Sequence, residues 1–297
     1  MPSAKIAHLT DRALIRIAGE DAHHFLQNLV TADIEETDAN GASSTALLTP
    51  QGKILFDFLI YRTSDGYLAD APSTAAADLL KRLTFYRLRA KVDLELLGAD
   101  SGVFAVWDGP VEIKSALVAA TDPRTPLLGQ RIVAPVSALA GQTTASEADL
   151  EAYERHRIAT GVPEGLKDYS YSDIFPHDAD LDQLGGVSFT KGCYVGQEVV
   201  SRVQHRGTAR KRFVLVEGGR ALPEKGTPVT ADGKSVGEIG SSITSETGES
   251  VGLALLRLDK VAQAKDNGSP LHCGDVEIAV RIPDWAGFSF PEKHVSD

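Results

Sequence analysis

The stretch with the most potential for chemistry is residues 185–198, which read GGVSFTKGCYVGQE. It holds four glycines within twelve positions, which is typical of a backbone with unusual dihedral angles or a very close neighbour. Cys193 lies among them, and Lys191 stands two residues before it. A cation near a thiol lowers its pKa and favours the nucleophilic thiolate. The pattern therefore predicts a reactive thiol at Cys193 tuned by Lys191, with a buried structural cysteine as the alternative.

A basic segment follows the cysteine. The chain as a whole is acidic, with 30 Lys and Arg against 41 Asp and Glu and a formal net charge of −11. Six basic side chains nevertheless occur close together, with Glu198 as the nearby carboxylate: Arg202, His205, Arg206, Arg210, Lys211 and Arg212. We predict that this is the one dense positive cluster of the protein and that it receives an anionic ligand or a segment of nucleic acid. A solvated charged face is the alternative.

Asp57 is the third candidate. Residues 53–62 alternate as a strand does, with Leu55, Leu59 and Tyr61 on the face of Asp57 and apolar residues alone on the other face. Both faces are therefore expected to be covered, and a covered carboxylate needs a partner. That partner is either a ligand or a hydrogen-bonding group of the protein itself.

Composition and missing motifs exclude several classes of protein. Two cysteines, Cys193 and Cys273, cannot form a disulfide framework, which indicates a cytoplasmic protein. They also cannot by themselves hold an iron–sulfur cluster, which usually takes four thiolates. The chain has no P-loop, dinucleotide-binding, hydrolase-elbow or zinc-protease motif, and no Cys or His spacing that suggests a metal site. No segment has the length of a membrane span, and the first ten residues resemble neither a secretory signal nor a transit peptide.

Hydrophobic periodicity and turn residues predict the elements that position these candidates. Strands are expected at residues 14–17, 46–48, 53–62, 67–70, 92–96 and 103–107, and helices after residues 19–21, from Ser73 as N-cap, and from Ser146 as N-cap to Gly161. Residues 161–192 lack periodicity, which in a stretch of this length indicates a functional loop. Five short strand-like runs from Phe213 onward predict a small β-barrel of about 80 residues.

Around the cysteine the sequence resembles the YgfZ family. The signature of that family, K-G-C-aromatic-x-G-Q-E, is matched by Lys191, Gly192, Cys193, Tyr194, Gly196, Gln197 and Glu198. Further similar stretches are residues 25–29, 52–53, 161–163, 180–189 and 206–207, so the likeness covers essentially the whole chain.

The resemblance implies an α+β fold related to the T-protein of the glycine-cleavage system. That fold is a T-protein-like ring of two interleaved α+β domains with a C-terminal β-barrel and a central folate-binding hole. The domains expected here are residues 1–48 with 130–212 for folate-binding domain 1, 49–129 for α+β domain 2, and 213–297 for the barrel.

The resemblance also implies a tetrahydrofolate-dependent role in making or repairing 4Fe–4S enzymes. Cys193 and Lys191 are the expected catalytic residues. The expected tetrahydrofolate-binding residues are Asp57, Gly192, Tyr194, Gly196, Gln197, Glu198, Arg202 and Arg206. T-proteins usually carry two adjacent Asp where this chain has Phe56-Asp57, which argues against aminomethyl transfer.

We therefore predict a cytoplasmic, monomeric, tetrahydrofolate-binding factor without a stably bound iron–sulfur cluster. Its expected partners are 4Fe–4S client enzymes or iron–sulfur assembly proteins, with no membrane partner and no nucleic acid. Two alternatives stay open. One is a folate-dependent aminomethyl or one-carbon transferase, and the other is a tRNA-modification accessory protein that uses the basic segment.

Overall fold

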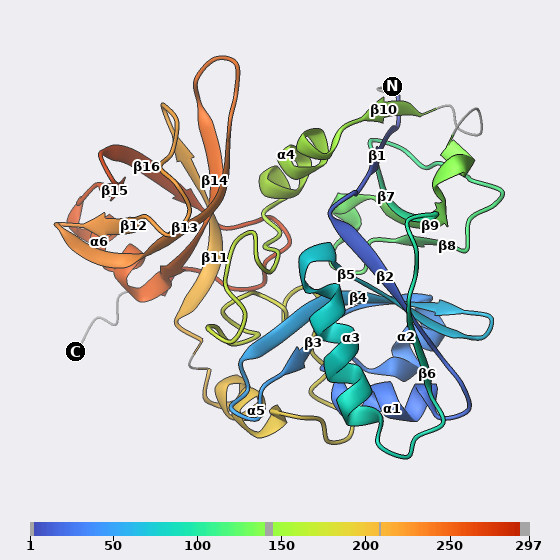
Figure 1. The fold of residues 1–297 in the computed structure, drawn as a ribbon. Coiled ribbons are helices and arrows are strands. Elements are labelled where there is room, and N and C mark those ends of the chain that lie inside the picture. The colour runs from blue at the N-terminus through green and yellow to red at the C-terminus, as the bar shows by residue number, and fades with distance from the viewer. Residues whose placement is uncertain (1–2, 140–144, 208, 292–297) are drawn as a thin grey trace. The chain divides into compact units, whose positions relative to one another are not determined.

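The computed structural model describes residues 3–139, 145–207 and 209–291. The chain divides into two compact units, which Figure 1 shows as ribbons. The first unit consists of Met1–Glu154 and Leu184–Val199, and the second of Arg155–Gln183 and Val200–Asp297. The glycine-rich segment around Cys193 therefore belongs to the same unit as Asp57, although the two are far apart in the sequence.

The first unit contains two β-sheets within its described residues. One sheet is antiparallel throughout, with its strands in the order β3 (Ala42–Leu48), β4 (Ile54–Thr63), β5 (Gly66–Pro72), β2 (Arg12–Ala18) and β6 (Asp93–Leu96). Three helices pack against these strands: α1 (Ala22–Leu29), α2 (Ile34–Asn40) and α3 (Ser73–Arg87). Figure 1 shows α3 lying across the sheet.

The other sheet has the order β10 (Ser146–Ala148), β1 (Lys5–His8), β7 (Ser101–Trp107), β9 (Gln130–Pro135) and β8 (Val118–Thr121). The short helices η1 (Pro126–Leu128) and η2 (Val136–Leu139) flank β9. The two sheets share a core, in which Leu59 and Tyr61 of β4 lie with Trp107 of β7 and Val133 of β9. Ile60 on the opposite face of β4 is buried as well, so the prediction that both faces of this strand are covered is confirmed.

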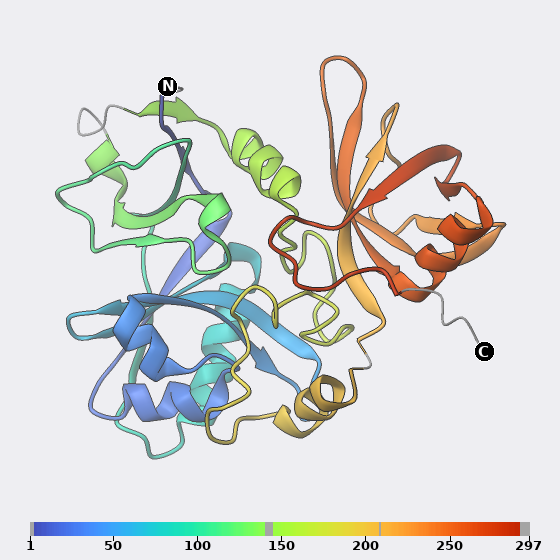
Figure 2. The same cartoon turned by 180° about the vertical axis from the view of Figure 1, so that it is seen from behind.

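The second unit contains a closed β-barrel within its described residues (Figure 2). The strands follow the order β11 (Lys211–Gly218), β14 (Ser250–Arg257), β13 (Lys234–Thr244), β12 (Pro228–Ala231), β15 (Leu271–Cys273) and β16 (Val276–Arg281). Helix α6 (Leu258–Asn267) packs against β14. Cys273 lies fully buried in the barrel core, and the predicted C-terminal barrel is confirmed.

The division of the chain into two units falls within two helices, α4 (Leu150–Thr160) and α5 (Gln197–Arg206). The end of α4 at Gly161 is as predicted, and this glycine has a φ of +86°, which favours a residue without Cβ. Between α4 and α5, residues 161–196 contain no helix or strand, in agreement with their lack of periodicity.

Both predicted serine N-caps are wrong. Ser73 is already inside α3, and the N-cap is Pro72, which makes no side-chain cap. Ser146 begins β10, which pairs in parallel with β1. The carboxylate of Asp149 accepts the amide of Ala152 at 2.8 Å and so caps α4 instead.

The strands join segments that the predicted domain boundaries separate. The boundary at 48/49 falls between β3 and β4, which are hydrogen-bonded neighbours in one sheet. The boundary at 129/130 falls between β8 and β9, which are also neighbours, and the one at 212/213 falls inside β11. The domain boundaries themselves stay a prediction.

Candidate functional site

Thr31 fastens the glycine-rich segment, residues 184–199, to the rest of the first unit. Its Oγ1 donates to the carbonyl of Gly186 at 2.5 Å, and its carbonyl accepts the amide of Ser188 at 2.9 Å. The same Oγ1 accepts the amide of Ala46 in β3 at 2.8 Å. One buried threonine therefore links the glycine-rich segment directly to the sheet that carries Asp57.

Lys191 holds the same segment a few residues further on. Its Nζ donates to the carbonyls of Val30 at 2.9 Å and of Ala32 at 2.6 Å, and it lies 5.4 Å from the ring centre of Tyr194. The side chain is 8 % exposed, and burial lowers its pKa to about 8. Its two acceptors are therefore the carbonyls of the residues immediately before and after Thr31 in the chain. Its tuning of Cys193 stays a prediction.

Cys193 is exposed, between two buried side chains. Lys191 precedes it and Tyr194 follows it, while Gly192 is exposed as well. The hydroxyl of Tyr194 has no hydrogen-bond partner among the described residues, and burial raises its pKa to about 12. The alternative of a buried structural cysteine is therefore wrong. The thiol of Cys193 is exposed, on a segment that Lys191 holds through its hydrogen bonds to Val30 and Ala32.

The role of Lys191 can be separated from that of the thiol by the variant Lys191→Met. We expect the rate of alkylation of Cys193 at neutral pH to stay within about twofold of the wild-type rate, because the ammonium is already bound by two carbonyls. Amide exchange at Ser188 to Lys191 should instead become faster. Iodoacetamide labelling of the folded chain reports Cys193 alone, since Cys273 is buried. A fall of about tenfold in that rate would support tuning by Lys191.

Gly196 lies against the turn between β3 and β4. It has a φ of +83°, and a Cβ at this position would lie 2.6 Å from the carbonyl oxygen of Thr49. Gly52 in that turn has a φ of +79°, and its Cβ would lie 2.9 Å from the Cβ of Val199. Both glycines are therefore required by the close packing of two backbones. The contact of Gly196 with folate stays a prediction.

Helix α5 carries four of the predicted ligand-binding residues. Gln197 is its first residue, and Glu198, Arg202 and Arg206 follow at intervals of four, so they lie along one face. Glu198 is in the first turn and Arg206 in the last turn, where each charge suits the helix dipole. All three charged side chains are exposed.

Asp57 is half-buried on β4 and lies opposite Ala46 of β3. It shares its strand face with Leu59 and Tyr61, which are in the core between the two sheets. Because Ala46 is bonded to Thr31, one strand separates Asp57 from the residue that holds the glycine-rich segment. The structure thus brings the Asp57 strand and the Cys193 segment into one region of the first unit.

The basic segment after Cys193 is smaller than predicted. Arg212 is buried, and it donates to Asp182 at 2.5 and 2.9 Å and to the carbonyl of His177 at 2.7 Å. Its charge is neutralised inside the second unit, so it is not available to a ligand. The segment is also not the one dense positive cluster, because residues 81–91 contain five cations and no carboxylate.

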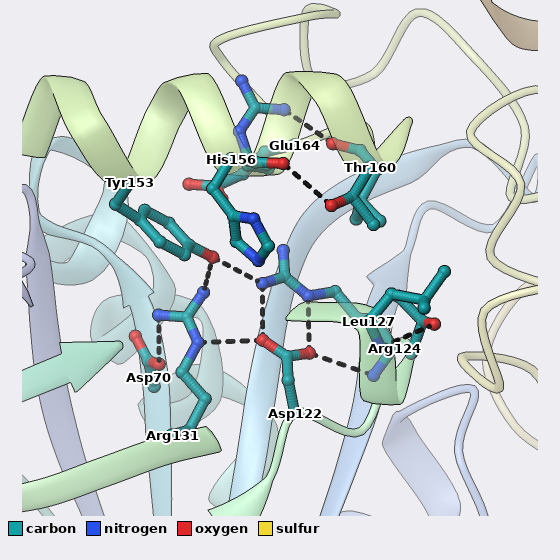
Figure 3. Close-up of polar contacts among 12 residues, drawn as sticks. Asp70, Asp122, Arg124, Leu127, Arg131, Tyr153, His156, Thr160 and Glu164 are labelled. Carbon is teal, nitrogen blue, oxygen red and sulfur yellow. Dashed lines mark hydrogen bonds and ion pairs between the residues drawn. The ribbon is translucent and has the colours of Figure 1, made fainter. Parts of the chain in front are cut away.

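The sequence patterns did not reveal a buried charge network in the first unit, drawn in Figure 3. Arg131 of β9 donates to Asp122 at 2.9 Å and to the hydroxyl of Tyr153 at 2.5 Å, and it lies 3.9 Å from the carboxylate of Asp70. Asp122 accepts two further bonds from the guanidinium group of Arg124, at 3.0 and 2.8 Å. Burial alone would raise the pKa of Asp122, but the two guanidinium groups hold it well below its ordinary value.

Asp70 connects this network to the other sheet. Its carboxylate accepts Nε of Arg12 at 2.6 Å and the hydroxyl of Tyr61 at 2.9 Å. Asp70 is on β5 and Arg131 on β9, so the network joins the two sheets through their shared core. The sequence does indicate that Asp70 needs a partner, because it is a carboxylate in an otherwise apolar strand, as Asp57 is.

Within the described ranges, no group of three or more His, Cys, Asp or Glu side chains could hold a metal ion. The helices described there are all too short or too polar to cross a membrane.

Known proteins similar to this chain include several assembly factors. The human mitochondrial iron–sulfur cluster assembly factor IBA57 is 33 % identical over 310 residues, which cover 93 % of this chain and 84 % of the human protein. The chain belongs to the IBA57 family. The mouse member is 31 % identical over 93 % of this chain and 84 % of its own length, and a member from Coccidioides immitis is 28 % identical over 96 % and 83 %. The YgfZ family is related to the IBA57 family, but membership of YgfZ itself is not shown.

The fold is that of the glycine-cleavage T-protein. The crystal structure of aminomethyltransferase T from Bartonella henselae matches with a TM-score of 0.74 and 17 % identity, over 96 % of this chain and 86 % of that one. Residues 210–288 also match the model of the CAF17 C-terminal β-barrel domain. The predicted α+β fold class with a C-terminal barrel is therefore confirmed.

The predicted cytoplasmic location is wrong. The named IBA57 relatives are mitochondrial proteins, which points to mitochondria instead. The prediction was based on the small number of cysteines. That observation argues only against an oxidising compartment and does not distinguish between compartments in which thiols stay reduced.

Proposed function

We propose that this chain assists the assembly or repair of 4Fe–4S enzymes, with Cys193 as a thiolate that contacts an iron–sulfur cluster shared with a partner protein. The observation that carries the proposal is the exposure of Cys193 between the buried side chains of Lys191 and Tyr194. One thiolate supplies a single ligand, and a cluster usually takes four. The other ligands therefore come from the partner, either a client enzyme or another assembly protein. The names of the family members as assembly factors support this role.

We further propose that the first unit binds tetrahydrofolate beside the glycine-rich segment. Asp57 is a half-buried carboxylate that can accept the N–H groups of a pterin ring. The buried hydroxyl of Tyr194, which has no partner among the described residues, offers a second polar contact. Arg202 and Arg206 lie in the part of α5 that belongs to the second unit, so their contact with the glutamate tail stays a prediction. Tetrahydrofolate, when bound, supplies one-carbon chemistry.

The variant Cys193→Ser tests the thiolate. In a strain that lacks this protein, we expect the variant to accumulate normally but to leave the activity of 4Fe–4S enzymes at the level of the deletion. Cys273→Ala is the matched control, because it removes the other cysteine, which is buried in the barrel core. Tetrahydrofolate binding, followed by the fluorescence of Trp107 and Trp285, should be unchanged in Cys193→Ser and weakened in Asp57→Ala.

Other outcomes would favour other functions. Full rescue by Cys193→Ser would remove the thiolate from the mechanism. Turnover of an aminomethylated carrier protein by the purified chain would favour the one-carbon transferase. Binding of tRNA that falls steeply with salt would favour the tRNA-modification accessory protein.

A further inference from the structure

Residues 81–91, KRLTFYRLRAK, form a positively charged region at the end of α3. Two large apolar side chains in this region are exposed, Phe85 at 69 % and Leu88 at 87 %. Lys81 and Phe85 are four residues apart on α3 and therefore share a face. We use the name basic–apolar patch for Lys81, Arg82, Phe85, Leu88 and Arg89.

Most of the positive charges in and beside this patch are not neutralised by ion pairs among the described residues. Lys91, next to the patch, pairs with Glu20 at 2.7 Å. In contrast, Lys81, Arg82 and Arg89 have no ion pair with any residue that the structure describes. Cations near the end of a helix interact favourably with its dipole, which gives a reason for basic residues there. It gives no reason for two exposed apolar side chains among them.

Leu88 combines an exposed side chain with an unfavourable backbone conformation. This residue follows α3 with a φ of 45° and a ψ of −104°, a conformation that is strained for any residue with a Cβ and is accessible to glycine. Leu88 is therefore strained and also leaves its side chain in water. Neither the backbone nor the core requires leucine here, and a strained residue with no role in folding is often functional.

The shape beside Leu88 indicates what kind of partner would fit. A hollow of about 460 Å³ is lined by residues 19, 20 and 87–93. A projecting side chain next to a hollow suits the irregular surface of a folded protein. The chain carries a net charge of −11, so an acidic protein would be directed to this patch and away from most of the remaining surface.

We propose that the basic–apolar patch is a docking surface for an acidic protein. The partner receives Leu88 and Phe85 in an apolar depression, and its carboxylates pair with Lys81, Arg82 and Arg89 around them. This is the usual arrangement of an apolar centre within a polar rim. The proposal concerns recognition alone, so it can fail or succeed independently of the chemistry at Cys193.

The first test introduces the photoreactive residue p-benzoylphenylalanine at position 88 of the full chain in its native host. A control chain carries it at position 117, where Leu117 is 58 % exposed in the same unit but outside the patch. We expect irradiation to give an adduct at position 88 that is absent at position 117, with a partner that mass spectrometry identifies as an acidic protein. The proposal is overturned by the absence of an adduct at position 88, by the same adduct at both positions, by a basic partner, or by a second copy of this chain.

The second test measures the affinity of the purified partner from that adduct for the full chain. Leu88→Gly removes the apolar side chain and relieves the backbone, so we expect binding to weaken about tenfold or more while the unfolding temperature stays the same or rises. The double variant Arg82→Glu and Arg89→Glu should weaken binding further. Lys114→Glu, which changes an exposed cation outside the patch, should have no effect. Unchanged affinity of Leu88→Gly would overturn the proposal. So would flotation with phosphatidylglycerol vesicles that Leu88→Gly abolishes, because it would identify a membrane.

Discussion

Replacing Arg131 by methionine is expected to lower the free energy of unfolding by about 3–5 kcal/mol. The guanidinium group is 1 % exposed and donates to Asp122 and to the hydroxyl of Tyr153. Methionine occupies similar space but donates no hydrogen bond. Both acceptors are buried, so each loses a donor that water cannot replace. The expected result is a lower midpoint in urea denaturation with an unchanged slope.

Arg16→Met is the matched control for this prediction. Arg16 also pairs with an aspartate, Asp65, but this pair is exposed to solvent. Exposed ion pairs contribute at most about 1 kcal/mol, because water screens the charges and the side chains lose entropy. Equal losses of stability in the two variants would show that burial of the Arg131 network has no special effect.

The contribution of Asp122 to this network should depend on pH. Its folded-state pKa is held well below the ordinary value, even though burial opposes this. An unfolded aspartate titrates at a pH of about 3.9. The stabilisation by ionised Asp122 is therefore complete above that pH and is lost as the pH falls toward the folded-state pKa. The difference in stability between the wild type and Arg131→Met should shrink on acidification below a pH of about 4.

Gly196→Ala is expected to cost about 2–3 kcal/mol of stability. The new Cβ would lie 2.6 Å from the carbonyl oxygen of Thr49, on a residue with a φ of +83°. The clash is with a backbone atom, which cannot rotate away as a side chain can. The turn before β4 and the glycine-rich segment must therefore move apart to remove it. A small gain from the lower entropy of the unfolded chain offsets only part of this cost. Urea denaturation measures the loss, and slower rescue of 4Fe–4S enzymes should accompany it.

Gly192→Ala provides the control within the same motif. A Cβ at Gly192 meets no atom within 4 Å, so this variant should keep the stability of the wild type to within about 1 kcal/mol. If both alanine variants were equally destabilised, the packing of Gly196 on Thr49 would not be the reason. Loss of function in Gly192→Ala without loss of stability would instead indicate contact with a ligand or partner at this exposed glycine.

Local patterns were sufficient for much of the fold. Alternation over residues 53–62 predicted β4, and the strand expected at residues 67–70 corresponds to β5. A strand buried on both faces and a turn with a positive φ each follow from neighbouring residues. The cap at Ser73 was wrong by one residue, because α3 already begins there. The cap at Ser146 was wrong because a serine before a helical pattern is equally compatible with a strand, here β10. Only pairing with β1 decides that case.

The sequence by itself determined which residues form the Cys193 motif, and through them the T-protein-like fold and the iron–sulfur context. The tertiary structure alone decided which atoms of the protein those residues contact. Lys191 donates to Val30, 161 residues away in the sequence, and Gly196 is required by the turn that contains Gly52. Periodicity records which face of an element is buried, but the partner atoms come from segments that are distant in the sequence and meet only in the folded chain. For the same reason, Asp70 could be recognised as a carboxylate in an apolar strand, while its position beside Arg131 could not.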